Sequence, residues 1–176
     1  MSTTPIGRNG ARPIARLRLS SFGNHATFTA HARGHRALLY TRQHREGAGV
    51  PKQFINPSNH HEPMGYSHAV KVDNTVYVAG QIAWDAQGNL VGPGDIEAQA
   101  VQVFENLKRV VEAAGASLED VVKTVVLITH PSYRDAYRSV RSRYLKEPFP
   151  ASTLAVIDSL AFPELLIEIE CVAVVE

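Results

Sequence analysis

The chain lacks several features that would narrow its class at once. It has one cysteine in 176 residues, Cys171, so no disulfide can form within it, which fits a reducing compartment. No run of about 18 apolar residues occurs, the length needed to span a membrane as a helix. A glycine-rich phosphate loop, a nucleophile elbow and a Cys-x-x-Cys pair are also missing. We therefore expect a cytoplasmic protein with no membrane partner.

Acidic residues are scarce at the N-terminus. Residues 1–52 hold nine Lys or Arg and one acid, Glu46, whereas residues 53–176 hold nine basic and sixteen acidic residues, a net charge of −7. A nucleic-acid interface needs a dense cationic face. The acidic body therefore argues against nucleic acid as a partner.

The basic arm, residues 1–52, shows no sustained apolar period, and its composition is typical of a poorly ordered segment. Three interpretations stay open. The start site could be assigned too far upstream, or the sequence added in cloning. The arm could be an organelle transit peptide, a class that is Arg-rich and acid-poor. It could also be a nucleic-acid-binding arm. In each case residues 53–176 are expected to form the domain.

Hydrophobic periodicity becomes readable from Ser67 onward. Asp73-Asn74 separates two alternating runs as a hairpin turn would. Asp95 and Gly115 flank a helical pattern as an N-cap and a C-terminal glycine. In chain order, we expect a hairpin over residues 70–79, a helix over 96–114, a strand over 121–129, a helix after Pro131, and strands over 152–158 and 165–175.

The order β-β-α-β-α-β-β predicts an α+β fold, with one mixed sheet carrying two helices on one face. The β-branched run over residues 121–129 is typical of a strand buried on both faces. One layer of two helices cannot cover both faces of such a sheet. We therefore expect a homotrimer.

Five segments match one protein family in order and spacing, over residues 53–176, about 70 per cent of the chain. Each alone is weak, and five in register are specific. They are Gly65-Tyr66-Ser67, Ala79-Gly80-Gln81-Ile82, Val111-Glu112-Ala113-Ala114-Gly115, Phe149-Pro150-Ala151 and the terminal stretch from Ile167 to Val174. The chain thus resembles the RidA/YjgF (Rid) family, whose members are often described as L-PSP endoribonucleases.

This resemblance implies a chorismate-mutase-like fold, a trimeric barrel and small-molecule pockets at the subunit boundaries. It implies hydrolytic deamination of small imines or enamines, with release of ammonia and without a cofactor. Glu168 falls on the family's catalytic glutamate. Tyr66, Gly80, Phe149 and Ser152 fall on or beside its substrate-binding positions.

Ser152 marks the main departure from the family. It stands where characterised members carry an arginine that clamps the substrate carboxylate, so the chain resembles an Arg-less subgroup. Arg offers a fixed charge and a bidentate fork, whereas Ser offers one neutral hydroxyl. Activity on 2-imino acids is therefore expected to be weak, with neutral or cationic imines, enamines or amides preferred.

Glu168 and Glu170 alternate with apolar residues, which predicts two carboxylates on one strand face about 7 Å apart. Such a pair is either a solvated acidic face or, with the family match, part of a pocket in which one pKa is raised. Cys171 shares the apolar face and is expected to be a core residue, not a nucleophile.

Other candidates have a structural interpretation beside the functional one. His60, His61, Glu62 and His68 could suggest a metal, but without a second ligand group at zinc-type spacing we expect a polar loop and no metal. Tyr66 either lines a pocket or fills space at the edge of the domain. Gly80 either admits a ligand or marks a sheet bulge.

Three classes of function remain open. The first is an enzyme that deaminates imines or enamines through Glu168. The second is a non-catalytic trimeric protein that binds small molecules. The third is a nucleic-acid or translation-related role of the basic arm. The stripe Arg134, Arg138 and Arg141 is better explained as a solvated helix face than as an RNA site.

Overall fold

The computed structural model describes residues 18–22, 25–32, 35–40 and 49–176, and it divides the chain into two units at Gly49 and Val50. In the first unit β1 (Arg18–Phe22), β2 (His25–Ala32) and β3 (His35–Tyr40) pair in order as an antiparallel sheet. The composition of this arm predicted no strands, so these three strands differ from expectation. Its residues 1–17, 23–24, 33–34 and 41–48 lie outside the described part.

The second unit contains a six-stranded mixed sheet with the strand order β4-β5-β6-β9-β7-β8. All neighbours are antiparallel except β7 and β8, which are parallel. The edge strand β4 adds a strand that the sequence did not indicate. The strands are β4 (Lys52–Ile55), β5 (Ala69–Val72), β6 (Thr75–Gln81), β7 (Val121–Ile128), β8 (Ala151–Val156) and β9 (Ile167–Val174).

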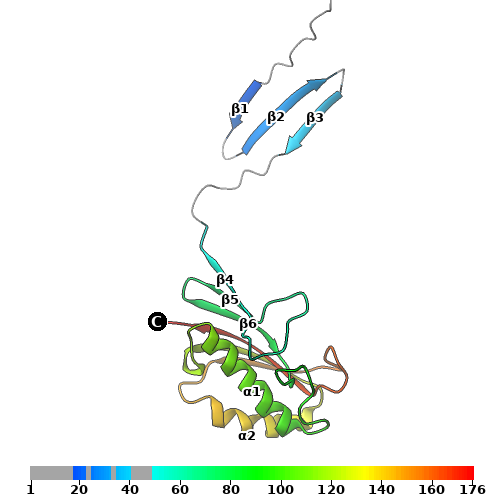
Figure 1. Ribbon diagram of the computed structural model, residues 1–176, viewed down its shortest axis with the longest axis vertical. Coiled ribbons are helices and arrows are strands. Elements are labelled where there is room, and N and C mark those ends of the chain that lie inside the picture. The colour runs from blue at the N-terminus through cyan, green and yellow to red at the C-terminus, as the bar shows by residue number, and fades with distance from the viewer. Residues whose placement is uncertain (1–17, 23–24, 33–34, 41–48) are drawn as a thin grey trace, which may run out of the picture. The chain divides into compact units, whose positions relative to one another are not determined.

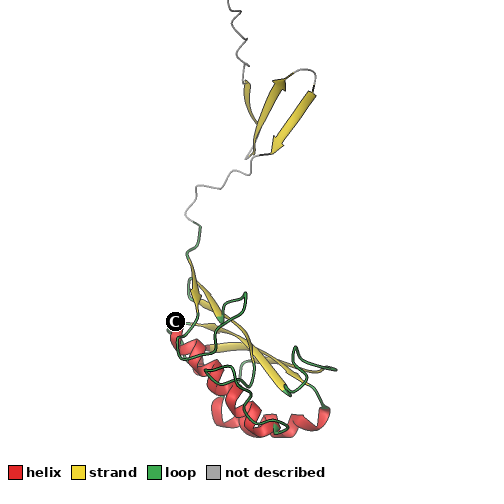
Figure 2. Cartoon of the chain, turned by 45° about the vertical axis from the view of Figure 1, so that its right-hand side comes forward, coloured by secondary structure: helices red, strands yellow, loops and turns green. Residues whose placement is uncertain are grey.

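Two helices, α1 (Ile96–Ala113) and α2 (Arg134–Tyr144), lie together on one face of this sheet (Figures 1 and 2). Short 3-10 turns, η1 (Leu118–Asp120) and η2 (Pro131–Tyr133), precede β7 and α2. The predicted layer arrangement is confirmed. Among the described residues, no helix combines the length and apolarity needed to cross a bilayer.

Local sequence determines both ends of α1, as predicted. The Asp95 side chain accepts hydrogen bonds from the amides of Glu97 and Ala98, which satisfies two amides of the first turn. Gly115 follows the last turn at φ +77°, and Ala116 N–H donates to Val111 O at 2.9 Å. These contacts form a Schellman-type ending, which requires the left-handed backbone that glycine adopts freely.

The hydrophobic core lies between the sheet and the helices. On β9, Ile167, Ile169, Cys171 and Ala173 are buried and face the helices, whereas Glu168 and Glu170 project from the other face. We call that other face the open face. On β7 the residues facing the helices are buried, but those on the open face are only partly covered. The predicted burial of this strand on both faces is therefore not reached within one chain.

The open face carries an apolar row across several strands. Phe54 pairs with Val70, Val70 with Tyr77, and Tyr77 with Val172. Phe54 is 69% exposed and Tyr77 is 53% exposed. Side chains that are paired across antiparallel strands lie on the same face. The sheet thus presents a stripe of large apolar groups that the two helices cannot cover.

Candidate functional site

Gly80 and Glu168 lie against each other where β6 bends past β9. The register of the two strands shifts between Val78 and Gln81, so Gly80 lies in an irregular segment of β6. A Cβ atom at Gly80 would fall 1.8 Å from Glu168 Oε1. The register shift agrees with the bulge interpretation of Gly80, and its missing side chain leaves room for the Glu168 carboxylate. That Gly80 also admits a ligand stays a prediction.

Tyr66 approaches the same place from the loop before β5. Its ring is 45% exposed, and its hydroxyl lies 3.0 Å from His61 Nε2. Burial raises the pKa of the Tyr66 hydroxyl, and the negative charge of Glu168 raises it further. Tyr66, Gly80 and Glu168 are thus brought together, and this trio is the candidate site.

The pKa of Glu168 is raised, as expected for its position. Burial raises the pKa of the Glu168 carboxyl, and the neighbouring charge of Glu170 adds to the rise. The expected rise in pKa is thus present, with burial as the larger cause and the like charge as the smaller one. A half-buried carboxylate with a raised pKa is suited to accept a proton and to return it.

Ser152 and Phe149 lie elsewhere in the same chain. Ser152 pairs with Thr124 on β7 and accepts a 2.9 Å hydrogen bond from its hydroxyl. Thr124 is 3% exposed and belongs to the helix face, opposite to the face of Glu168. Two strand spacings and three residues separate Ser152 from Glu168, roughly 14 Å. The five predicted residues therefore form two groups within one chain.

A cation stands beside Ser152 and Phe149. The Arg141 guanidinium lies over the Phe149 ring, 5.1 Å from its centroid. Burial raises the pKa of the Tyr137 hydroxyl, while the charge of Arg141 and hydrogen bonds with Ser152 and Arg141 oppose that rise. Arg141 Nε is buried and has no hydrogen-bond partner among the described residues. We call Tyr137, Arg141, Phe149 and Ser152 the edge cluster.

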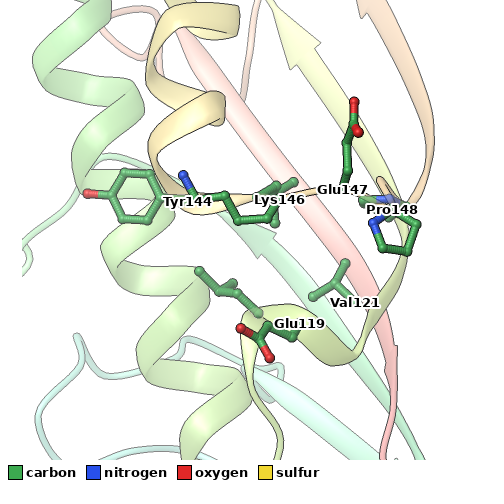
Figure 3. A pocket seen from close by; sticks show the side chains of 9 residues that line it. Glu119, Val121, Tyr144, Lys146, Glu147 and Pro148 are labelled. Atoms are coloured by element: carbon green, nitrogen blue, oxygen red, sulfur yellow. The ribbon is translucent and has the colours of Figure 1, made fainter.

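A separate pocket of about 450 Å³ opens between η1, the end of α2 and the segment before β8 (Figure 3). Glu119, Tyr144, Lys146 and Glu147 are among its lining side chains. It reaches Val121, at the start of β7, whereas Glu168 pairs with Leu127 near its end, about 20 Å along the strand. None of the predicted site residues lines this pocket.

Three histidines of the loop before β5 differ from expectation. His60, His61 and His68 are 5%, 5% and 0% exposed, so they are packed inside the domain and do not form a polar loop. Their spacing in the sequence matched no metal motif, and a buried cluster was not foreseen. The polar and turn-forming residues around them gave no indication of burial.

Cys171 is buried in the core, as predicted. Burial raises the pKa of its thiol to about 12, so it stays protonated at neutral pH. A protonated thiol is a poor nucleophile.

Comparison with known proteins extends this picture. Residues 59–175 match the family model described as Endoribonuclease L-PSP. A 2-iminobutanoate/2-iminopropanoate deaminase of Dermatophagoides farinae is 38% identical over 127 residues, covering 72% of this chain and 98% of that protein. A RutC family protein of Pyrococcus abyssi is 38% identical over 125 residues, covering 70% and 98%. The crystal structure of RidA from the Antarctic bacterium Psychrobacter sp. PAMC 21119 superposes with a TM-score of 0.66 at 39% identity, covering 70% and 99%.

Proposed function

Because the chain belongs to the L-PSP endoribonuclease family, which includes the RidA proteins, we propose that it hydrolyses a small imine or enamine to a carbonyl compound and ammonia. The observation that carries this proposal is the placement of the Glu168 carboxylate over Gly80, near enough to Tyr66 for its charge to raise the pKa of the Tyr66 hydroxyl. A carboxylate with a raised pKa next to a second proton donor suits the addition of water to a carbon–nitrogen double bond.

The proposed reaction uses Glu168 first as a base and then as an acid. Its carboxylate takes a proton from water as the oxygen attacks the imine carbon, and it passes that proton to the imine nitrogen, which gives a carbinolamine. Glu168 then takes the proton of the new hydroxyl group and gives it to the amine nitrogen as the carbon–nitrogen bond breaks. A carbonyl compound and ammonia are released, and Glu168 is again ionised. An enamine enters the same route after protonation at carbon. Water supplies all the atoms added to the substrate, and Glu168 ends in its starting state, so the reaction needs no cofactor.

A second subunit would complete the site that the trio forms. Support comes from the uncovered row of Phe54, Val70, Tyr77 and Val172 on the face from which Glu168 projects. An apolar stripe of this kind is typical of an oligomer interface. We propose that three chains associate through the open face, and that the edge cluster of one subunit faces the trio of the next.

In such a trimer, Arg141 could supply the positive charge of the arginine that is missing at position 152. The Arg141 guanidinium and Ser152 both form hydrogen bonds with the Tyr137 hydroxyl, so a fixed positive charge that could attract an anionic group lies near position 152. Its reach is restricted by its contact with Phe149. We therefore expect Arg141 to bind a substrate carboxylate more weakly than an arginine at position 152 would. The preference for anionic over neutral substrates should be correspondingly smaller.

The rival function is a trimeric protein that binds small molecules without turning them over. Ser152 favours this alternative, because a carboxylate ligand held by Arg141 alone would not be drawn toward Glu168. Both functions predict ligand binding at the same site. They differ in whether removing the Glu168 charge abolishes a reaction or leaves binding unchanged.

The test is ammonia release from freshly generated 2-iminobutyrate and 2-aminoacrylate by the full-length protein. Glu168→Gln keeps the size of the side chain over Gly80 and removes its basicity, so the rate should fall at least a hundredfold. Glu170→Gln, on the same strand face but exposed, is the matched control and should keep most of the rate. Equal rates for wild type and Glu168→Gln would reject the proposed chemistry, and binding without turnover would favour the rival.

A further inference from the structure

The buried histidines His60, His61 and His68 form a compact cluster between the loop before β5 and the end of β6. One ring nitrogen from each lies within 4.8 Å of those of the other two. Their ring centroids are 4.0 to 4.7 Å apart. Three imidazoles of this kind, all nine-tenths or more buried, are an unusual filling for a domain interior.

Each histidine uses its Nε2 atom in a contact with the protein. His60 Nε2 lies 2.8 Å from Gln81 Oε1, and Gln81 donates its own amide to Ala79 O. His68 Nε2 lies 2.8 Å from the carbonyl of His61. Both partners are acceptors, so the proton of each neutral ring is on Nε2 and the lone pair is on Nδ1. His61 Nε2 can likewise donate to the Tyr66 oxygen.

The three Nδ1 atoms are left without partners. All are buried, and none has a hydrogen-bond partner among the described residues. A buried, unpaired acceptor is destabilising, and nearly all such groups in native proteins are satisfied. Because the Nε2 atoms of His60 and His68 donate to oxygen acceptors, the Nδ1 atom of each ring offers a lone pair.

We propose that His60, His61 and His68 bind a divalent transition-metal ion such as Zn²⁺ through their Nδ1 atoms. Neutral imidazoles are preferred ligands of such ions, and ligating histidines usually donate the other ring N–H to a carbonyl, carboxylate or water. The contacts of His60 and His68 follow that pattern. Tetrahedral ligands about 2.1 Å from zinc lie about 3.4 Å apart, which is the separation that the three Nδ1 atoms would adopt on binding.

The site would fasten the loop that carries Tyr66. His60 and His61 precede Tyr66, His68 follows it, and the His61 ring contacts the Tyr66 hydroxyl. A bound ion would therefore tie both ends of this loop to one point beside β6. This inference does not depend on the deaminase proposal, because a metal that orders the loop would do so whatever the trio binds.

The test uses the full-length protein, stripped of metal with a chelator and titrated with ZnCl₂ by calorimetry. We expect one ion per chain with a dissociation constant of about 1 μM or lower. A hundredfold excess of zinc over that constant should raise the melting temperature by about 5–10 °C. A wild-type protein that takes up no zinc, or shows no rise in melting temperature, would overturn the proposal without reference to any variant.

Two variants locate the site. In His60→Gln and His68→Gln the new amide can still make the Nε2 contact, but the Nδ1 ligand is lost, so zinc affinity should fall at least tenfold in each. His130→Gln is the matched control, because His130 is exposed in the turn after β7, and its affinity should equal that of wild type. Undiminished binding by the two cluster variants would place the ligands elsewhere, for example among the four histidines of residues 1–49, and would reject the site.

Discussion

The carboxylate of Glu168 occupies the space that a side chain at Gly80 would need. A Cβ atom built on Gly80 would lie 1.8 Å from Oε1 and 2.7 Å from Cδ of Glu168. β6 shifts register beside this contact, and the Glu168 side chain packs directly against the backbone of Gly80. The position of the proposed catalytic group thus depends on the absence of a side chain on the neighbouring strand.

Gly80→Ala should displace Glu168 and lower activity about tenfold or more. Any Cβ at this position must push the carboxylate aside, which also costs about 1 kcal/mol of stability. Urea unfolding and ammonia release would measure both effects. In a Glu168→Ala background the stability cost of Gly80→Ala should nearly vanish, because the clashing atoms are gone.

Gly49→Ala is the control for this substitution, since nothing lies within 4 Å of a Cβ built there. It should leave both stability and activity unchanged. Gly80→Ala could instead lower stability equally with and without the Glu168 side chain. In that case the backbone conformation of the bulge, and not the contact with Glu168, requires glycine.

The pH dependence of activity should reflect the raised pKa of Glu168. A general base works when deprotonated, so the rate should rise with pH through a midpoint above the ordinary value of 4.5. Glu170→Gln removes the like charge, which should move that midpoint to lower pH. A profile whose midpoint is unaffected by Glu170→Gln would show that the two carboxylates do not interact.

The same shift carries a stability prediction with a definite sign. Glu168 binds its proton more tightly in the folded state, so its favourable contribution is complete below pH 4.5 and is lost as pH rises through its folded pKa. Relative to Glu168→Gln, the wild type should therefore become less stable between pH 4 and pH 7.5. Chemical denaturation of both proteins at these two pH values measures the difference.

Ser152→Arg should raise the rate on 2-imino acids by about tenfold, because a charged donor replaces a neutral one. Ser152→Ala removes the hydroxyl without adding charge and serves as the control. The gain should be absent for a neutral imine. Comparable gains on neutral and anionic substrates would mean that Ser152 does not face the substrate carboxylate.

If the wild type already acts on 2-imino acids as fast as an arginine-bearing relative, Arg141 is the expected source of the charge. Arg141→Gln should then raise KM for anionic substrates and leave neutral ones unchanged. Arg138→Gln, one turn earlier on α2 and exposed, is the control for charge loss on this helix. Arg141 also contacts the Phe149 ring, so its replacement could alter the assembly. Light scattering of the Arg141→Gln variant should therefore accompany the kinetics.

Light scattering should give a mass of about 58 kDa, three times the 19.3 kDa of one chain. Tyr77→Glu places a charge in the open-face row and should shift the protein toward monomers. Lys108→Glu changes charge at an exposed position of α1, on the opposite side of the sheet, and should leave the mass unchanged. A wild-type mass of about 19 kDa at micromolar concentration would contradict the interfacial site.

Removal of residues 1–49 should change the melting temperature of the second unit by less than about 5 °C, roughly 1 kcal/mol. The cut at Gly49 is chosen because β4 begins at Lys52 and pairs with β5. Removal of residues 1–55 deletes that strand and should lower the melting temperature further. A large fall from the first truncation alone would show that the arm packs on the domain.

Much of the fold follows from local sequence. The Asp95 cap, the Gly115 ending and the turn at Asp73, whose φ is +53°, each depend on a few neighbouring residues. The alternation on β9 likewise determines that Glu168 and Glu170 share a face while Cys171 enters the core. Such features are readable because helix and strand periods and turn chemistry act over short stretches of chain.

The site required tertiary structure. The family match predicts that Gly80 and Glu168 belong to one site, but only the register shift between β6 and β9 explains why these residues, 88 positions apart, meet directly. The same match predicts that Ser152 and Glu168 share a pocket between subunits, and the pairing of β8 with β7 shows that Ser152 faces the helices of its own chain. The histidines lie close together in the sequence, but their burial depends on packing against β6. Contacts between distant segments are decided by strand order and register, and short-range patterns do not contain that information.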